Sequence, residues 1–128
     1  MRLRILLICL VVATAGAADL QKYEYRILPI GKIPTMEKAM NEAAADGYSF
    51  QAVTGEEGQD LVIVMGKALD GETHRGKTYK LLSTSKISTM QEELQQAGEA
   101  GFRLLEITFA HTSYWGGNKL VCILSKEE

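Results

Sequence analysis

Cysteine is scarce in this chain: the 128 residues include two, Cys9 and Cys122. Cys9 lies in an N-terminal leader that we expect to be removed, so the mature chain keeps one cysteine and cannot form an internal disulfide. A small disulfide-stapled fold is therefore excluded. Cys122 lies in the apolar run 120–124, which is typical of a free cysteine that acts as a small buried hydrophobic residue. A reactive thiol is the alternative.

Long apolar runs are missing beyond the leader. Arg2 and Arg4 supply a positive start, residues 5–12 form an apolar stretch, and residues 15–17 are small. This pattern predicts a signal peptide over residues 1–17 and an exported protein, periplasmic or secreted. The apolar stretch is too short to span a membrane and no second one follows, so we expect no membrane span.

An excess of basic residues is missing too. Removal of Arg2 and Arg4 leaves 12 basic and 16 acidic residues, which gives a formal net charge of −4. Nucleic acids and anionic membranes both call for a basic surface. We therefore expect neither as a partner.

Recognisable catalytic and metal-binding motifs are also absent from the sequence. The histidines, His74 and His111, have no cysteine or carboxylate at metal-ligand spacing. Ser113 lies near His111, but there is no Gly-x-Ser-x-Gly turn and no acid placed to orient the imidazole. No dinucleotide-binding glycine pattern or P-loop occurs, and the acidic cluster at 56–60 fits no calcium loop. We expect no metal and no cofactor.

What the sequence does contain is one pattern written twice. A shift of 54 residues aligns positions that are identical in the two halves: Tyr25 with Tyr79, Leu28 with Leu82, Lys32-Ile33 with Lys86-Ile87, Thr35-Met36 with Thr89-Met90, Ala43 with Ala97, Gly47 with Gly101 and Thr54 with Thr108. The shift then grows by five, and residues 61–67 align with 120–126. This periodicity indicates a duplication with one longer loop in the second copy.

Each copy shows the same order of expected elements. Opening strands are predicted at 23–28 and 78–82, second strands at 48–54 and 102–109, and third strands at 61–65 and 120–124. Tyr23, Tyr25 and Ile27 alternate with charged residues, which is typical of a half-buried strand. The third strands are apolar at every position, which predicts central strands that are covered on both faces.

A helix is expected between the first and second strands of each copy. We expect the helices to start near Thr35 and Thr89, the second with a capping box formed by Thr89 and Glu92. Met36, Met40 and Ala43, like Met90, Leu94 and Ala97, form an apolar stripe at helical spacing. Gly47 and Gly101 follow the helices where a left-handed residue is needed.

These elements predict an α+β fold of two tandem βαββ repeats, with one helix and three strands each, packed about a pseudo-twofold axis. The third strand fits between the other two and antiparallel to both, while the crossover through the helix is right-handed. One copy alone would be a marginal core. We therefore predict one compact domain over 18–128, with repeats at 22–67 and 77–126 and a linker at 68–76. Stacked and continuous sheets both remain open.

The repeated pieces resemble a family of small bacterial proteins known as "domain of unknown function 4177". The matching residues are 25–28, Asp46-Gly47-Tyr48 and 61–67, and in the second copy 79–82, Ala100-Gly101-Phe102 and 120–126. Members often carry tryptophan after the glycine, where this chain has Tyr48 and Phe102. The resemblance implies the fold and brings no activity or catalytic residues.

The second hairpin, which holds the extra residues, is the candidate site for function. We expect an extended β-ribbon whose contact residues are His111, Tyr114, Trp115 and Asn118. The leading hypothesis is an exported non-enzymatic module that binds a protein or a small molecule, with monomer and oligomer both left open. The alternatives are a small hydrolase-like enzyme centred on His111 and a structural subunit of an envelope assembly. Packing of these aromatic residues on the sheet is the competing interpretation of the ribbon.

Overall fold

The computed structural model describes residues 20–28, 32–55, 61–69, 77–112 and 117–127. Two helices and six strands follow one another as β1 (Tyr23–Ile27), α1 (Ile33–Ala45), β2 (Ser49–Thr54), β3 (Val62–Ala68), β4 (Lys77–Thr84), α2 (Ile87–Glu99), β5 (Arg103–Thr112) and β6 (Gly117–Glu127). The α+β class is confirmed. The expected leader 1–17 and residues 70–76 of the expected linker lie outside the described residues.

The strands form two three-stranded antiparallel sheets. The order is β1-β3-β2 in the first sheet and β4-β6-β5 in the second, so the apolar third strand of each half is central, as predicted. Each sheet has an irregularity at the same place, between Phe50 and Ala52 in β2 and between Leu104 and Glu106 in β5. Such bulges bend a strand and redirect its side chains.

The helices begin two residues earlier than the sequence pattern predicts. Lys32 and Lys86 are the N-caps, no side chain caps either helix, and Met90 N–H donates to Lys86 O. The predicted capping box of Thr89 and Glu92 is therefore wrong, because Thr89 already lies inside the first turn.

The helix ends agree with the prediction. Gly47 and Gly101 have φ of 92° and 94°, which places both in the left-handed region that glycine adopts at little cost. Tyr48 N–H donates to Ala43 O, and Phe102 N–H donates to the oxygen of Ala97, each at 3.0 Å. These are Schellman motifs, and each sends the chain directly into the next strand.

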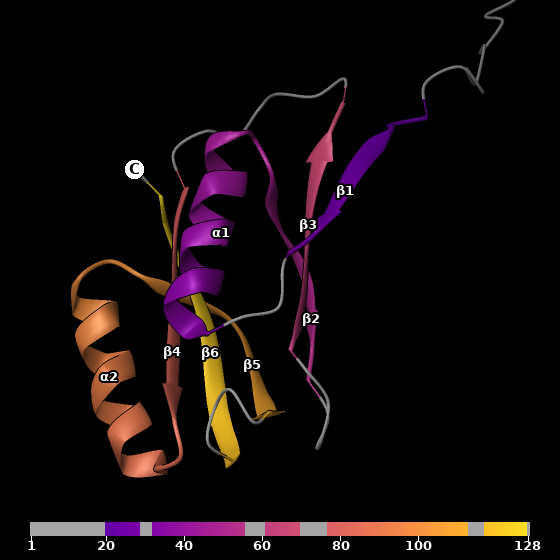
Figure 1. The fold of residues 1–128 in the computed structure, drawn as a ribbon. Helices are drawn as coiled ribbons and strands as arrows, with labels where there is room; N and C mark the ends of the chain where they lie inside the picture. Colours follow the sequence, from indigo (N-terminus) through magenta and orange to yellow (C-terminus); the bar gives the residue numbers. More distant parts are fainter. Residues whose placement is uncertain (1–19, 29–31, 56–60, 70–76, 113–116, 128) are drawn as a thin grey trace, which may run out of the picture.

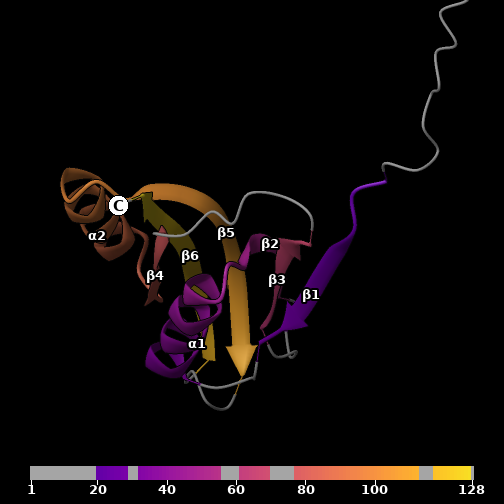
Figure 2. The same ribbon diagram turned by 90° about the horizontal axis from the view of Figure 1, so that it is seen from above.

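Helix α1 lies in the angle between the two sheets, and α2 covers the other face of the second sheet (Figures 1 and 2). The main buried cluster contains Met36 and Met40 of α1, Met65 of the first sheet, and Tyr79 and Ile123 of the second. The two halves therefore share one core.

A smaller buried cluster lies between α2 and the second sheet. Its members are Met90, Ala97, Cys122 and Leu124. Cys122 is fully buried, and burial raises the pKa of its thiol. The interpretation of Cys122 as a core residue is thus confirmed.

None of the described helices is long and apolar enough to cross a membrane.

Candidate functional site

The ribbon predicted from the sequence is formed by β5 and β6. Their ladder extends to the pairs His111↔Asn118 and Thr112↔Gly117, so two of the candidate residues stand opposite each other on neighbouring strands. Tyr114 and Trp115 lie outside the described residues, as does Ser113. The assignment of this ribbon as a binding site stays a prediction.

A different surface stands out among the described residues: the outer face of the first sheet. Tyr23, Tyr25 and Ile27 of β1 are 53%, 63% and 68% exposed. Ile27 stands opposite Val64 of β3, which stands opposite Ala52 of β2, so these apolar residues share one face. We call this surface, made of Tyr23, Tyr25, Ile27, Ala52, Val62 and Val64, the open face.

The open face departs from the sequence-based expectation. Tyr23, Tyr25 and Ile27 were expected to be the buried side of a half-buried strand, yet every described residue of β1 is exposed. The central strand β3 was expected to be covered on both faces. Ile63 and Met65 are fully buried on one face, whereas Val62 and Val64 on the other are only partly buried. The expectation is wrong for the first sheet because no described element packs on this side.

The matching face of the second sheet is covered. Tyr79 and Leu81, which lie 54 positions after Tyr25 and Ile27, are 2% and 4% exposed. Both belong to the core cluster that includes α1. The two sheets thus carry the same apolar pattern on this face. Helix α1 covers the face in the second sheet and leaves it exposed in the first.

Polar side chains of α1 also bind the free edge of β4. The Asn41 side-chain amide donates from Nδ2 to Tyr79 O at 3.0 Å and accepts at Oδ1 from Tyr79 N–H at 2.7 Å. Glu37 Oε1 accepts from Leu81 N–H at 3.2 Å. The pair of bonds made by Asn41 imitates a neighbouring strand, so the edge of β4 is closed by a helix.

The side chain of Tyr79 extends this contact to the first sheet. Its hydroxyl accepts from Phe50 N–H at 2.8 Å, next to the irregularity in β2. Burial raises the pKa of the Tyr79 phenol. Tyr79 is therefore fixed to the first half of the chain at its backbone and at its hydroxyl.

The edge of β1 has the opposite character. Leu28 N–H donates to Ile63 O, and Lys22 O accepts from Leu69 N–H. Because hydrogen-bonded and non-bonded pairs alternate along an antiparallel edge strand, the N–H and C=O groups of Tyr23, Tyr25 and Ile27 point to the free edge. The open face is bordered by backbone groups that can accept a partner.

The aromatic residue that follows each helix-ending glycine, Tyr48 or Phe102, lies close to two cationic side chains. The Arg26 guanidinium lies 4.3 Å from the centre of the Tyr48 ring, and Lys67 Nζ lies 5.6 Å from it. Arg26 also pairs with Asp46 at 3.4 Å. Burial, with Glu24 nearby, raises the pKa of the Tyr48 phenol.

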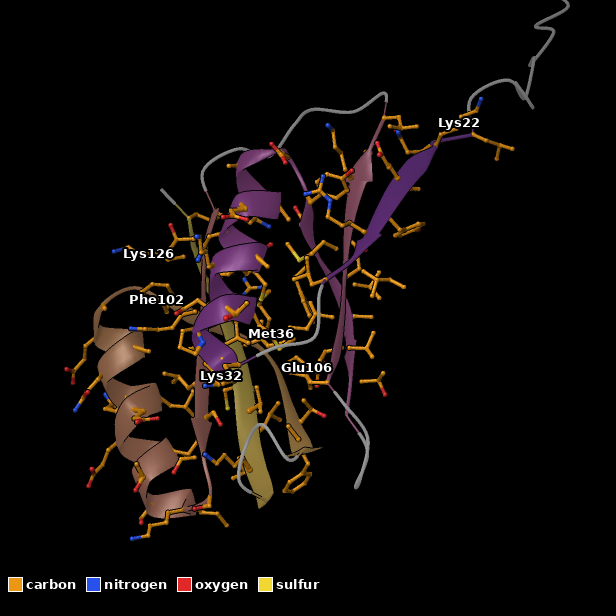
Figure 3. All side chains as sticks on the ribbon, in the orientation of Figure 1. Lys22, Lys32, Met36, Phe102, Glu106 and Lys126 are labelled. Atoms are coloured by element: carbon orange, nitrogen blue, oxygen red, sulfur yellow. The ribbon has the colours of Figure 1, made fainter. Side chains whose placement is uncertain are left out.

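The second half repeats this arrangement. The ammonium groups of Lys80 and Lys126 lie 5.0 and 5.8 Å from the centre of the Phe102 ring; Phe102 and Lys126 are labelled in Figure 3. Because both halves keep it and it is built on the helix ends, we interpret the cation–aromatic contact as structural.

A cavity of about 420 Å³ lies beside the start of α1. Its lining residues are Lys32, Ile33, Pro34, Leu81, Leu82, Ser83, Glu93 and Lys119. The Ser83 hydroxyl is buried and without a hydrogen-bond partner among the described residues. Among the described residues that line the cavity there is no histidine to activate this serine, so they do not form a nucleophile–base pair.

Metal coordination finds no support in the described part of the chain. Nowhere in it do three His, Cys, Asp or Glu side chains lie close enough together to hold a metal ion.

No family model, curated protein or solved structure matches this chain.

Sequence reasoning missed the open face as a candidate site, although its residues are visible in the sequence. The signal was the combination of an apolar alternation in β1 with a third strand that is apolar on both sides. Both features also occur in the second half, where they mark a buried face.

Proposed function

We propose that this protein is an exported, non-enzymatic module that binds a protein partner through the open face. One observation supports this proposal above all: Tyr25 and Ile27 are exposed, whereas Tyr79 and Leu81, in the same positions of the second sheet, are buried under a helix. A sheet that carries a core pattern on an uncovered face is typical of an interaction surface.

The chemistry of the open face favours a protein over a small molecule. The face is presented by strands rather than enclosed in a pocket, and tyrosine supplies large contact area with a polar end. The free backbone edge of β1 adds hydrogen bonds that another polypeptide can satisfy.

We infer further that the two halves are copies of one βαββ unit, as in the family that the sequence resembles. Their contact is one-sided, since α1 covers Tyr79 while the open face around Tyr25 is exposed. If a pseudo-twofold axis related the two units, the corresponding residues Tyr25 and Tyr79 would be equally buried in the contact between them. Stacking of one unit on the next describes this contact better than the twofold relation that we expected from the sequence.

Site-specific photocrosslinking in the exporting cells tests the proposed function. A photoreactive phenylalanine analogue at Tyr25 samples the open face, one at Trp115 samples the ribbon, and one at Glu42, an exposed position on α1, is the control. We expect a protein adduct at position 25 well above the level at position 42. Equal adducts at both positions would remove the open face as a binding site, and an adduct confined to position 115 would assign binding to the ribbon instead.

A further inference from the structure

Most of the exposed large hydrophobic side chains of the described residues lie on two surfaces. Tyr23, Tyr25 and Ile27 belong to the open face. A second group lies on α2 and β5, with the exposed fractions Ile87 78%, Leu104 45%, Ile107 48% and Phe109 60%. We call this second group, with the exposed polar residues of α2 beside it, the α2/β5 surface.

The α2/β5 surface repeats the surface of the first half that packs on the second sheet. On α1 the residues Ile33, Glu37, Asn41 and Ala44 form one stripe, and none of them is fully exposed. The residues 54 positions later on α2 are Ile87, Gln91, Gln95 and Gly98, and all four are exposed. We call these four residues the α2 stripe.

The strands show the same relation. Phe50 and Val53 of β2 are partly buried against the main core. The residues 54 positions later, Leu104 and Ile107 of β5, are 45% and 48% exposed. The described residues therefore carry, exposed on two surfaces, both halves of the contact that holds the two sheets together.

We propose that the open face of one molecule docks on the α2/β5 surface of a second copy of the same chain. This inference rests on the proposed function and names the partner. It places Gln95 where Asn41 lies inside the chain, so the Gln95 amide bonds the N–H and C=O of Tyr25. Gln91 takes the position of Glu37 and accepts from Ile27 N–H.

The remaining contacts follow the same correspondence. The Tyr25 hydroxyl accepts from Leu104 N–H of the neighbouring copy, as Tyr79 accepts from Phe50. Glutamine can replace asparagine in this role because its amide has the same donor and acceptor, on a stem longer by one methylene group. Gly98 lies in the position of Ala44, and a Cβ built on it meets nothing within 4 Å.

Such an interface joins unlike surfaces. A contact of this kind leaves one free surface at each end of a pair, so it continues into a chain of molecules unless the rotation between copies closes a ring. Repeat proteins avoid this continuation with polar terminal units, whereas the open face and the α2/β5 surface both expose apolar side chains. Assembly is therefore expected to depend on protein concentration.

Analytical ultracentrifugation of the purified exported protein tests the proposal with three variants. Ile27→Lys blocks the open face, Gln95→Lys blocks the α2 stripe, and Gln96→Lys makes the same change one residue outside the stripe as a matched control. We expect the wild type and Gln96→Lys to assemble alike. Each blocking variant weakens association by about tenfold or more, since it removes apolar contact or a bidentate hydrogen bond.

Mixing the two blocked variants supplies the decisive measurement. Ile27→Lys keeps an intact α2/β5 surface and Gln95→Lys keeps an intact open face, so an equimolar mixture forms a one-to-one heterodimer at concentrations where each variant alone is monomeric. Failure of the mixture to form this heterodimer overturns the proposal. If Gln95→Lys assembles like the wild type and Ile27→Lys does not, the open faces pair with each other instead.

Two further outcomes separate this inference from the proposed function. A wild type that stays monomeric at all concentrations overturns self-association, while an adduct of another protein at position 25 still supports the open face as a binding site. Assembly that Ile27→Lys leaves unchanged overturns the inference and also removes the open face from the interface.

Discussion

Replacing Asn41 with alanine tests whether a single amide closes the edge of β4. The change removes the acceptor for Tyr79 N–H at 2.7 Å and the donor to Tyr79 O at 3.0 Å. Tyr79 is only 2% exposed. An unsatisfied buried backbone group costs about 1–3 kcal/mol. Because Asn41 itself is only partly buried, water can reach part of the vacated space, and we expect a total loss of about 2–4 kcal/mol.

Such a loss is large against a typical domain stability of about 5–15 kcal/mol. Urea unfolding followed by circular dichroism measures it as a lower midpoint at unchanged slope. Asn41→Asp is expected to fall between wild type and Asn41→Ala, because a carboxylate keeps the acceptor for Tyr79 N–H and loses the donor.

Gln95→Ala is the matched control, because Gln95 lies 54 positions later, on the exposed side of α2. In dilute solution, where no second copy is bound, we expect this change to stay within about 0.5 kcal/mol of wild type. If Asn41→Ala and Gln95→Ala lose the same stability, or if Asn41→Ala loses less than about 0.5 kcal/mol, the reasoning that Asn41 substitutes for a strand is refuted.

Three other predictions address the backbone and the titration of the core. Gly101→Ala is expected to lower the free energy of unfolding by about 1–2 kcal/mol, because Gly101 has a positive φ. Gly98→Ala is expected to raise it by about 0.5–1 kcal/mol, because Gly98 lies inside α2 and an added Cβ meets open space. Thermal unfolding compares the two variants. Gly55→Ala brings a Cβ onto the Phe109 carbonyl and is expected to destabilise the protein by more than about 3 kcal/mol. The measurement is urea unfolding, in which the midpoint falls. Burial raises the pKa of Tyr79 above 10.0, so its contribution is complete below pH 10 and is lost as the pH rises through the folded-state pKa; a urea midpoint that stays constant from pH 9 to about 11 would contradict this.

The sequence was sufficient to predict the local architecture. Gly47 and Gly101 ended the helices because the left-handed conformation is a local requirement that few other residues meet. The third strands, which are apolar at every position, were placed correctly at the centre of each sheet, although β3 is covered on one face only. Helix starts were less well defined: Thr89 has capping-box spacing with Glu92, yet Lys86 supplies the first carbonyl acceptor.

The open face could not be predicted from the sequence. Tyr25 and Tyr79 have the same neighbours in the sequence pattern, and their exposure differs because α1 covers one sheet and no described element covers the other. That difference depends on how two similar units are placed in space, which no local pattern encodes. The ribbon at His111 and Asn118 was predicted from the extra residues of the second copy, and its ladder is present, while its role in binding is untested.

The position of α1 links the unfolding of the two halves. Its methionines belong to the buried cluster that both sheets share, and Asn41 and Glu37 satisfy backbone groups of β4, so separating the halves opens this cluster and breaks these hydrogen bonds at once. We expect β3 and β6 to exchange their amide hydrogens through one cooperative opening. Helix α2 packs through a smaller cluster on the second sheet alone, so it can open locally at lower cost, and its amides should exchange first.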